Sequence, residues 1–189
     1  MKTNLLKTLS VAALLPLIVC GADRDELLDG VKKVGAEGGS VTRWLVCGEN
    51  AVAVAHEGTG STLIAAAQVG KGRIVFLPGR DWLPSAATAK IGDMEKFYEN
   101  LVQWCGVEKT MKAISNRPET ADWLKARGIE ASRSGSPGQF KAGLKDADLV
   151  MFEMNRGLIS LWSTILEIAE KGGCVVLSAN VWNPKDLKK

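Results

Sequence analysis

The chain has 189 residues, 46% of them hydrophobic and 24% charged, with 24 basic and 21 acidic side chains. This length and composition fit one globular domain with its own hydrophobic core. Residues 1–22 hold two of the lysines and no acidic residue, which leaves 22 basic against 21 acidic side chains in the remainder. A balance so close to neutral argues against a nucleic-acid partner.

The N-terminal segment has the pattern of an export signal. Lys2 and Lys7 precede an apolar stretch at 9–19, and the small residues Gly21 and Ala22 follow it. This order is typical of a secretory signal peptide, and the apolar stretch is shorter than the ~20 residues that a spanning helix needs. We therefore predict a signal peptide at 1–22 and one mature domain at 23–189, periplasmic or secreted and without a transmembrane helix.

Cys20 leaves a second outcome open. Residues 17–20 resemble the lipid-attachment box of bacterial lipoproteins, although Val19 is bulkier than the small residue usual before the cysteine. Cleavage after Ala22 would remove Cys20. Lipidation of Cys20 would instead tether the domain to a bacterial membrane.

The mature chain would retain three cysteines, Cys47, Cys105 and Cys174. Each lies in or beside an apolar run, and free cysteine is commonly a buried small hydrophobe. We expect three buried thiols and no disulfide.

The first half of the mature chain predicts a helix followed by antiparallel strands. Apolar spacing predicts a helix at 25–34, which the glycines at 35–39 end. Apolar, β-rich runs predict strands at 41–47, 51–56, 62–69 and 73–77. The tight glycine turn at 70–72 joins the last two strands as a β-hairpin.

In the second half, helical and strand patterns alternate. Helices are predicted at 93–105, 119–127, 140–144 and 158–171, and strands at 111–115, 129–132, 149–154 and 174–179. This alternation indicates an α/β fold, with a mostly parallel sheet covered by helices on both faces and an antiparallel hairpin portion in the N-terminal half.

Several different short motifs follow one another along the chain, and their shared order is informative. They are LLDGV at 27–31, GE at 48–49, AAAQVGKGR at 65–73, an Asn-to-Trp pattern at 100–104, WL at 123–124, DLV at 148–150, GG at 172–173 and Trp182. Together they resemble the N-terminal region of the TRP channel-associated factors and of bacterial proteins with an enhancin-like, mucin-degrading metallopeptidase domain.

The resemblance implies a flavodoxin-like fold of the class I glutamine-amidotransferase type over almost the whole mature chain. In that family a much larger remainder with the peptidase domain follows this region, whereas this sequence stops soon after Trp182. The resemblance therefore implies an accessory region without the peptidase domain. A truncated fragment of a larger secreted peptidase is the alternative.

A zinc-peptidase site is not expected on this chain. Such a site needs two histidines one helical turn apart and a neighbouring glutamate, and His56, followed by Glu57, is the single histidine here. We expect no bound metal and no other cofactor.

A cysteine-based hydrolase, as in amidotransferases, is the catalytic alternative. It would use Cys47 as nucleophile and His56 as base, with Glu57 orienting the histidine. None of the cysteines stands on the strand-to-helix turn that exposes such a nucleophile. We therefore expect a domain that is not an enzyme, with Cys47 and His56 as the residues to test.

Six tryptophans raise a carbohydrate-binding hypothesis, because an indole face can stack on a sugar ring. Helical spacing places Trp104, Trp123 and Trp162 in the core. Trp44, Trp82 and Trp182, near strand or loop ends, remain candidates for stacking.

The loop after the predicted strand 73–77 holds the first ligand candidates. Arg80, Asp81 and Trp82 follow that strand, and open α/β sheets bind ligands beyond the carboxyl ends of their strands. We predict an exported, non-catalytic domain that binds a protein or glycan partner through these residues and Trp182.

Overall fold

The computed structural model describes residues 20–35, 42–106 and 110–179, with side chains from residue 24 onward. Most of the expected signal peptide, the side chain of Cys20 and Trp182 lie outside the described residues. Within the described part, no helix is long and apolar enough to cross a bilayer.

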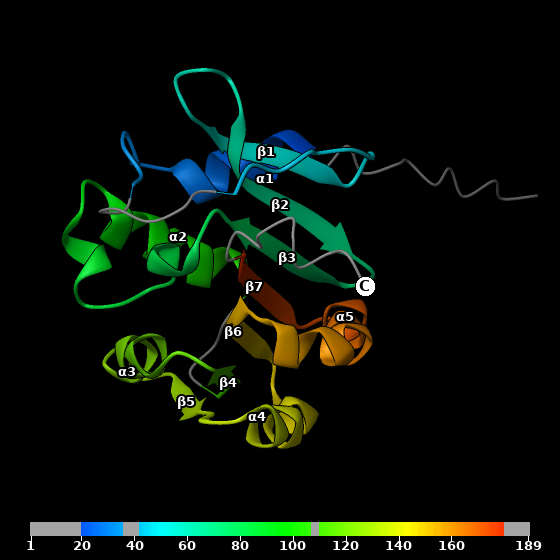
Figure 1. Ribbon diagram of the computed structural model, residues 1–189. Helices are drawn as coiled ribbons and strands as arrows, with labels where there is room; N and C mark the ends of the chain where they lie inside the picture. Colours follow the sequence, from blue (N-terminus) through cyan, green and yellow to red (C-terminus); the bar gives the residue numbers. More distant parts are fainter. Residues whose placement is uncertain (1–19, 36–41, 107–109, 180–189) are drawn as a thin grey trace, which may run out of the picture.

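Seven strands form one mixed sheet in the order β1-β2-β3-β7-β6-β4-β5 (Figure 1). Strands β1, β2 and β3 pair antiparallel, and β3, β7, β6, β4 and β5 pair parallel. The predicted α/β sheet with its antiparallel hairpin is therefore confirmed. The strands are β1 (Ala51–His56), β2 (Thr62–Val69), β3 (Gly72–Leu77), β4 (Lys112–Ser115), β5 (Glu130–Arg133), β6 (Leu149–Met154) and β7 (Cys174–Ala179).

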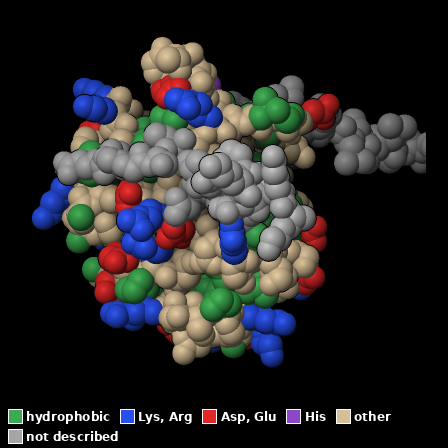
Figure 2. Space-filling model, viewed as in Figure 1, with side chains coloured by type: hydrophobic (Ala, Val, Ile, Leu, Met, Phe, Trp, Pro, Cys, Tyr) green, Lys and Arg blue, Asp and Glu red, His purple; other side chains and the backbone are tan. Residues whose placement is uncertain are grey.

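Helices cover both faces of the sheet (Figure 1). Because successive strand side chains point to opposite faces, Leu149 and Met151 of β6 join one core cluster while Val150 and Phe152 join the other. The helices that pack on the first cluster are α1 (Cys20–Leu28), α2 (Met94–Trp104) and α3 (Pro118–Lys125), and those on the second are α4 (Pro137–Gly143) and α5 (Trp162–Lys171). Figure 2 shows basic and acidic side chains interspersed over one face of the molecule.

The β2–β3 hairpin packs closely against the end of α5. The backbone N–H of Lys71 donates to the carbonyl oxygen of Glu170 at 3.2 Å. A Cβ atom on Gly72 would lie 2.1 Å from the carbonyl oxygen of Gly173, so only glycine fits there. The glycines of this turn therefore permit a close approach between two backbone segments.

Two predicted elements of the N-terminal half differ from the structure. Helix α1 ends at Leu28 rather than at residue 34, because Gly30 adopts a left-handed φ of 69°. Residues 42–47 form no strand, although the N–H of Trp44 donates to the carbonyl oxygen of Thr62 at 3.0 Å.

The expectation of three buried thiols is wrong. Cys105, just after α2, and Cys174, the first residue of β7, form a disulfide with Cα atoms 5.4 Å apart. Cys47 is a free cysteine, but it is exposed. The sequence pattern could not show that the end of α2 lies over the start of β7, which comes 69 residues later.

Candidate functional site

A groove of about 700 Å³ lies between the β3–α2 connection and α3. One side is formed by residues 85–90, and the other by the face of α3 that carries Trp123 and Ala126. The two segments follow the carboxyl ends of β3 and β4, where open α/β sheets usually bind ligands. The volume lies within the usual range of ligand pockets, about 300–1,000 Å³.

Reciprocal hydrogen bonds shape the connection that forms the first side. The N–H of Ser85 donates to Oγ1 of Thr88 at 3.0 Å, and the N–H of Thr88 donates to Oγ of Ser85 at 3.1 Å. Oγ1 of Thr88 also donates to the carbonyl oxygen of Leu83 at 3.1 Å. These bonds fold residues 85–90 into a compact turn that ends in the 3₁₀ helix η2 (Thr88–Lys90).

Helix α3 forms the second side, and Arg127 fixes its end. Pro118 occupies the first turn, where its missing N–H costs nothing. The guanidinium of Arg127 lies 3.7 Å from the ring centre of Trp123 and forms an ion pair with Glu95 at the start of α2. Burial lowers the pKa of Arg127. Trp123 itself is only 3% exposed, so its ring contributes to the core more than to the groove surface.

The groove surface is rich in small apolar side chains. Both sides contribute alanines, which leave room for a ligand backbone to approach: Ala86, Ala87, Ala89 and Ala126.

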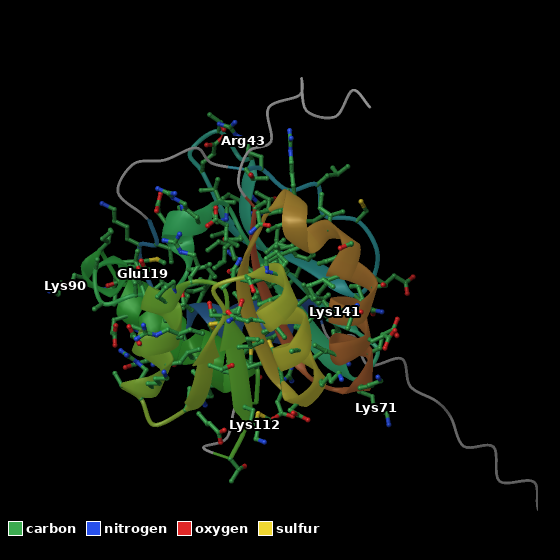
Figure 3. All side chains as sticks on the ribbon, turned by 60° about the horizontal axis from the view of Figure 1, so that its bottom comes forward. Arg43, Lys71, Lys90, Lys112, Glu119 and Lys141 are labelled. Carbon is green, nitrogen blue, oxygen red and sulfur yellow. A yellow bond between two sulfur atoms is a disulfide. The ribbon has the colours of Figure 1, made fainter. Side chains whose placement is uncertain are left out.

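The carboxylates of the groove all have arginine partners. The pairs are Glu119 with Arg117 at 3.5 Å, Asp122 with Arg133 at 2.7 Å, and Glu95 with Arg127. Lys90 also lines the groove; its backbone N–H donates to the carbonyl oxygen of Ala87, but its side-chain ammonium has no hydrogen-bond or ion-pair partner within the described residues. Figure 3 shows Lys90 and Glu119 on the same side of the molecule. Among the described residues, Lys90 is therefore the exposed positive charge of the groove that no acidic side chain compensates.

A smaller hollow of about 130 Å³ lies where the strand order reverses, between β4 and β6. The side-chain amide of Asn116 donates to the carbonyl oxygen of Glu153 and accepts from its N–H, both at 2.9 Å. The side chain of Asn155 accepts from the N–H of Gly157 at 3.0 Å. These side chains already satisfy local backbone groups, so the larger groove is the better ligand candidate.

The predicted ligand residues of the β3 connection lie close to the groove but do not line it. Trp82 is 7% exposed and belongs to the core, whereas Arg80 is exposed and forms an ion pair with Asp81 at 3.4 Å. All three form the 3₁₀ helix η1 (Arg80–Trp82). Trp182 lies outside the described residues, so its role stays a prediction.

The other tryptophans are buried or half-buried. Trp104 and Trp123 belong to the core, and Trp162 packs partly against it. Trp44 is half-buried and its ring centre lies 5.1 Å from that of Phe76. None of the tryptophans within the described residues is fully exposed.

Of the residues of the predicted catalytic alternative, Cys47 and His56 are exposed and Glu57 is half-buried. Nδ1 of His56 lies 3.2 Å from the carbonyl oxygen of Gly60. Glu57 accepts hydrogen bonds from Arg43 and Thr59, which lower its pKa to about 2. In the described part of the chain, no hydrogen bond joins His56 to Cys47 or to Glu57, and no group of three His, Cys, Asp or Glu residues could hold a metal ion.

Comparison with models of protein families shows to which family the chain belongs. The family model TCAF_N, described as "TRPM8, N-terminal domain", matches residues 8–185. The chain belongs to this family. A comparison with curated proteins found no match.

Solved structures place a similar fold in a metallopeptidase. IMPa from Pseudomonas aeruginosa in complex with an O-glycopeptide matches with a TM-score of 0.65 at 15% identity, over 85% of this chain and 19% of IMPa. The IMPa metallopeptidase in complex with T-antigen matches with a TM-score of 0.62, at the same identity and coverage. The TCAF_N chain thus spans about a fifth of the length of IMPa, and the likeness is one of fold.

The sequence of this TCAF_N domain drew attention to the β3–α2 connection, but the residues that it singled out, 80–82, do not line the candidate groove. Residues 85–90 carry no motif, and their partner side lies in α3, some thirty residues further on. The one local signal was the small-residue run SAATAK at 85–90, which permits close approach of a ligand but does not predict one.

Proposed function

We propose that this TCAF_N-family chain is an exported, non-catalytic domain that binds a polypeptide partner, as an accessory region of a secreted peptidase system. The observation that carries the proposal is the groove between residues 85–90 and α3, with its small apolar sides and with Lys90, which no acidic side chain of the described part of the chain compensates. The match of 85% of this chain to 19% of IMPa supports an accessory role beside a larger catalytic remainder.

The two tryptophans at or beside the groove favour a polypeptide over a glycan at this site. Sugar recognition by stacking needs an open indole face. Trp82 and Trp123 are 7% and 3% exposed, and Arg127 lies over the ring of Trp123. A glycoprotein partner would then be bound through its polypeptide part.

Two features support export. The sequence pattern of residues 1–22 is that of a signal peptide. The Cys105–Cys174 disulfide agrees with an oxidising compartment, because such bonds persist outside the reducing cytosol. Whether Cys20 tethers the domain to a membrane is a separate question, answered by mass spectrometry of the mature N-terminus.

The function is tested by binding of the purified full chain to an immobilised, O-glycosylated mucin-type glycoprotein before and after enzymatic removal of its glycans. Biolayer interferometry should give similar affinities for both forms. Loss of binding with the glycans would assign a sugar partner, and binding to neither form would count against the proposal. Turnover of the same glycoprotein that disappears in Cys47→Ala would support the hydrolase alternative instead.

A further inference from the structure

We propose that the groove between residues 85–90 and α3 receives an extended, acidic peptide segment, with one of its carboxylates paired to Lys90. The inference rests on the proposed function and adds the site and the chemistry of the partner. Three observations support the inference: the pairing of the charged side chains that line the groove, the small apolar side chains on its two sides, and the burial of the Trp123 ring.

The charge pattern selects an anionic ligand. Glu95, Glu119 and Asp122 each have an arginine partner, whereas the Lys90 ammonium has no partner within the described residues. An incoming carboxylate can pair with Lys90 and leave every existing ion pair intact. A cationic ligand would have to share a carboxylate that already has an arginine partner and would meet the charge of Lys90.

The surface of the groove suits a peptide backbone. Ala86 and Ala87 on one side and Ala126 on the other are exposed and have no side-chain bulk beyond Cβ. Small side chains on both sides allow an extended segment to lie between them and to bury its own apolar side chains against methyl groups. The charged side chains that also line the groove then fix the orientation of the segment.

The same groove is poorly suited to a neutral sugar. Trp123 presents no open face, because Arg127 lies 3.7 Å above its ring and only 3% of the residue is exposed. The carboxylates of the groove each have an arginine partner, which leaves fewer of their acceptor sites for sugar hydroxyls.

The first experiment screens a random-sequence peptide library displayed on phage with the full-length chain. We expect the selected peptides to be enriched in Asp and Glu relative to the unselected library. Enrichment in Lys and Arg, or no specific enrichment, would overturn the inference.

The second experiment measures the affinity of the tightest selected peptide for three variants. Lys90→Glu should weaken binding by about tenfold or more, equivalent to about 1.4 kcal/mol. Ala126→Trp should abolish binding by filling the groove. The matched control Lys125→Glu reverses an exposed charge of α3 that does not line the groove, and it should change affinity by less than about twofold, as expected for an unpaired surface charge.

A charge exchange makes the test specific. A peptide in which the critical Asp or Glu is replaced by Lys should lose affinity for the wild-type chain and regain it for Lys90→Glu, as an ion pair across the interface requires. Circular dichroism and the melting temperature establish that each variant remains folded. All three variant positions are exposed, and substitutions at exposed positions usually change the free energy of unfolding by less than about 0.5 kcal/mol.

The outcomes separate this inference from the proposed function. If the wild type binds selected peptides but Lys90→Glu and Ala126→Trp bind them equally well, the domain binds polypeptides elsewhere and the groove assignment is wrong. If the wild type binds no peptide, both proposals fail. A neutral glycan whose binding is lost in Ala126→Trp would assign the groove to a sugar and overturn the inference.

Discussion

The hydroxyl of Tyr98 in α2 donates a 3.1 Å hydrogen bond to the carbonyl oxygen of Trp82 in η1. Both residues belong to the core, and burial raises the pKa of Tyr98, so its hydroxyl remains a donor well above neutral pH. This bond fixes the start of the connection whose later residues, 85–90, form one side of the groove. The position of the groove therefore depends on a polar contact in the core.

Tyr98→Phe should lower the free energy of unfolding by about 1–2 kcal/mol, because the buried carbonyl of Trp82 loses its donor while the packing is retained. Urea denaturation followed by tryptophan fluorescence measures the change. Phe97→Leu, a substitution in the neighbouring core residue that removes no hydrogen bond, reports the cost of altered packing alone. An unchanged stability of Tyr98→Phe would contradict the importance of this bond.

Removal of the disulfide should destabilise the domain strongly. The bond joins residues separated by 69 positions, and loop-closure entropy for a loop of this size predicts a contribution of about 4 kcal/mol. The double variant Cys105→Ala/Cys174→Ala should melt well below the wild type. A reductant should lower the melting temperature of the wild type but not that of the double variant, which has no disulfide to reduce. Cys47→Ala is the control, because this exposed cysteine forms no disulfide and its loss should leave the melting temperature unchanged.

Gly72→Ala should destabilise the β2–β3 hairpin. Its new Cβ would lie 2.1 Å from the carbonyl oxygen of Gly173 and 2.3 Å from that of Ala169, and such overpacking costs about 1–3 kcal/mol. Gly138→Ala is the matched control in α4, where a Cβ meets no atom within 4 Å. Since alanine favours helix over glycine, Gly138→Ala should stabilise by about 0.5–1 kcal/mol. Equal effects of both substitutions in thermal denaturation would refute the packing argument.

Asp93 should make stability depend on pH in the acidic range. Its carboxylate accepts hydrogen bonds from the backbone N–H groups of Lys32 and Lys33, both at 2.8 Å, and these bonds lower its pKa in the folded chain. A lowered pKa stabilises the fold fully above the unfolded value of about 3.9 and less as pH falls through the folded value. The expected result is a destabilised Asp93→Asn variant at pH 6 whose deficit shrinks below about pH 4.

The measurement for Asp93 is the melting temperature against pH for both proteins. Glu99→Gln serves as the control, because it neutralises an exposed carboxyl in α2, the helix that Asp93 precedes. A deficit of Asp93→Asn that stays constant down to low pH would show that the carboxylate charge is not what holds residues 32–33.

Most of the sheet could be predicted from the sequence. Strands β1, β2, β6 and β7 begin and end where the apolar runs do, because each run is bounded by glycine, polar or charged residues that interrupt the pattern. The β2–β3 hairpin was likewise predictable from its glycine turn. Local pattern and tertiary structure agree in these segments.

The disulfide and the groove could not be predicted in this way. Both bring together segments that are distant in sequence, namely Cys105 with Cys174 and residues 85–90 with α3. The burial of Trp82 could not be predicted either. From the sequence, a tryptophan in a loop is a candidate for ligand binding, but in the structure Trp82 packs against α2 in the core. Side-chain direction in a loop is set by tertiary contacts, which periodicity does not report.

The disulfide also decides what a proteolytic cut would do to the molecule. Everything from β4 to α5 lies between Cys105 and Cys174, including the side of the groove formed by α3. A single cleavage in this segment would leave two pieces that remain covalently joined. In denaturing electrophoresis, a nicked molecule would therefore run as one band without reductant and as two bands with it. Both sides of its groove would stay in one covalently joined molecule.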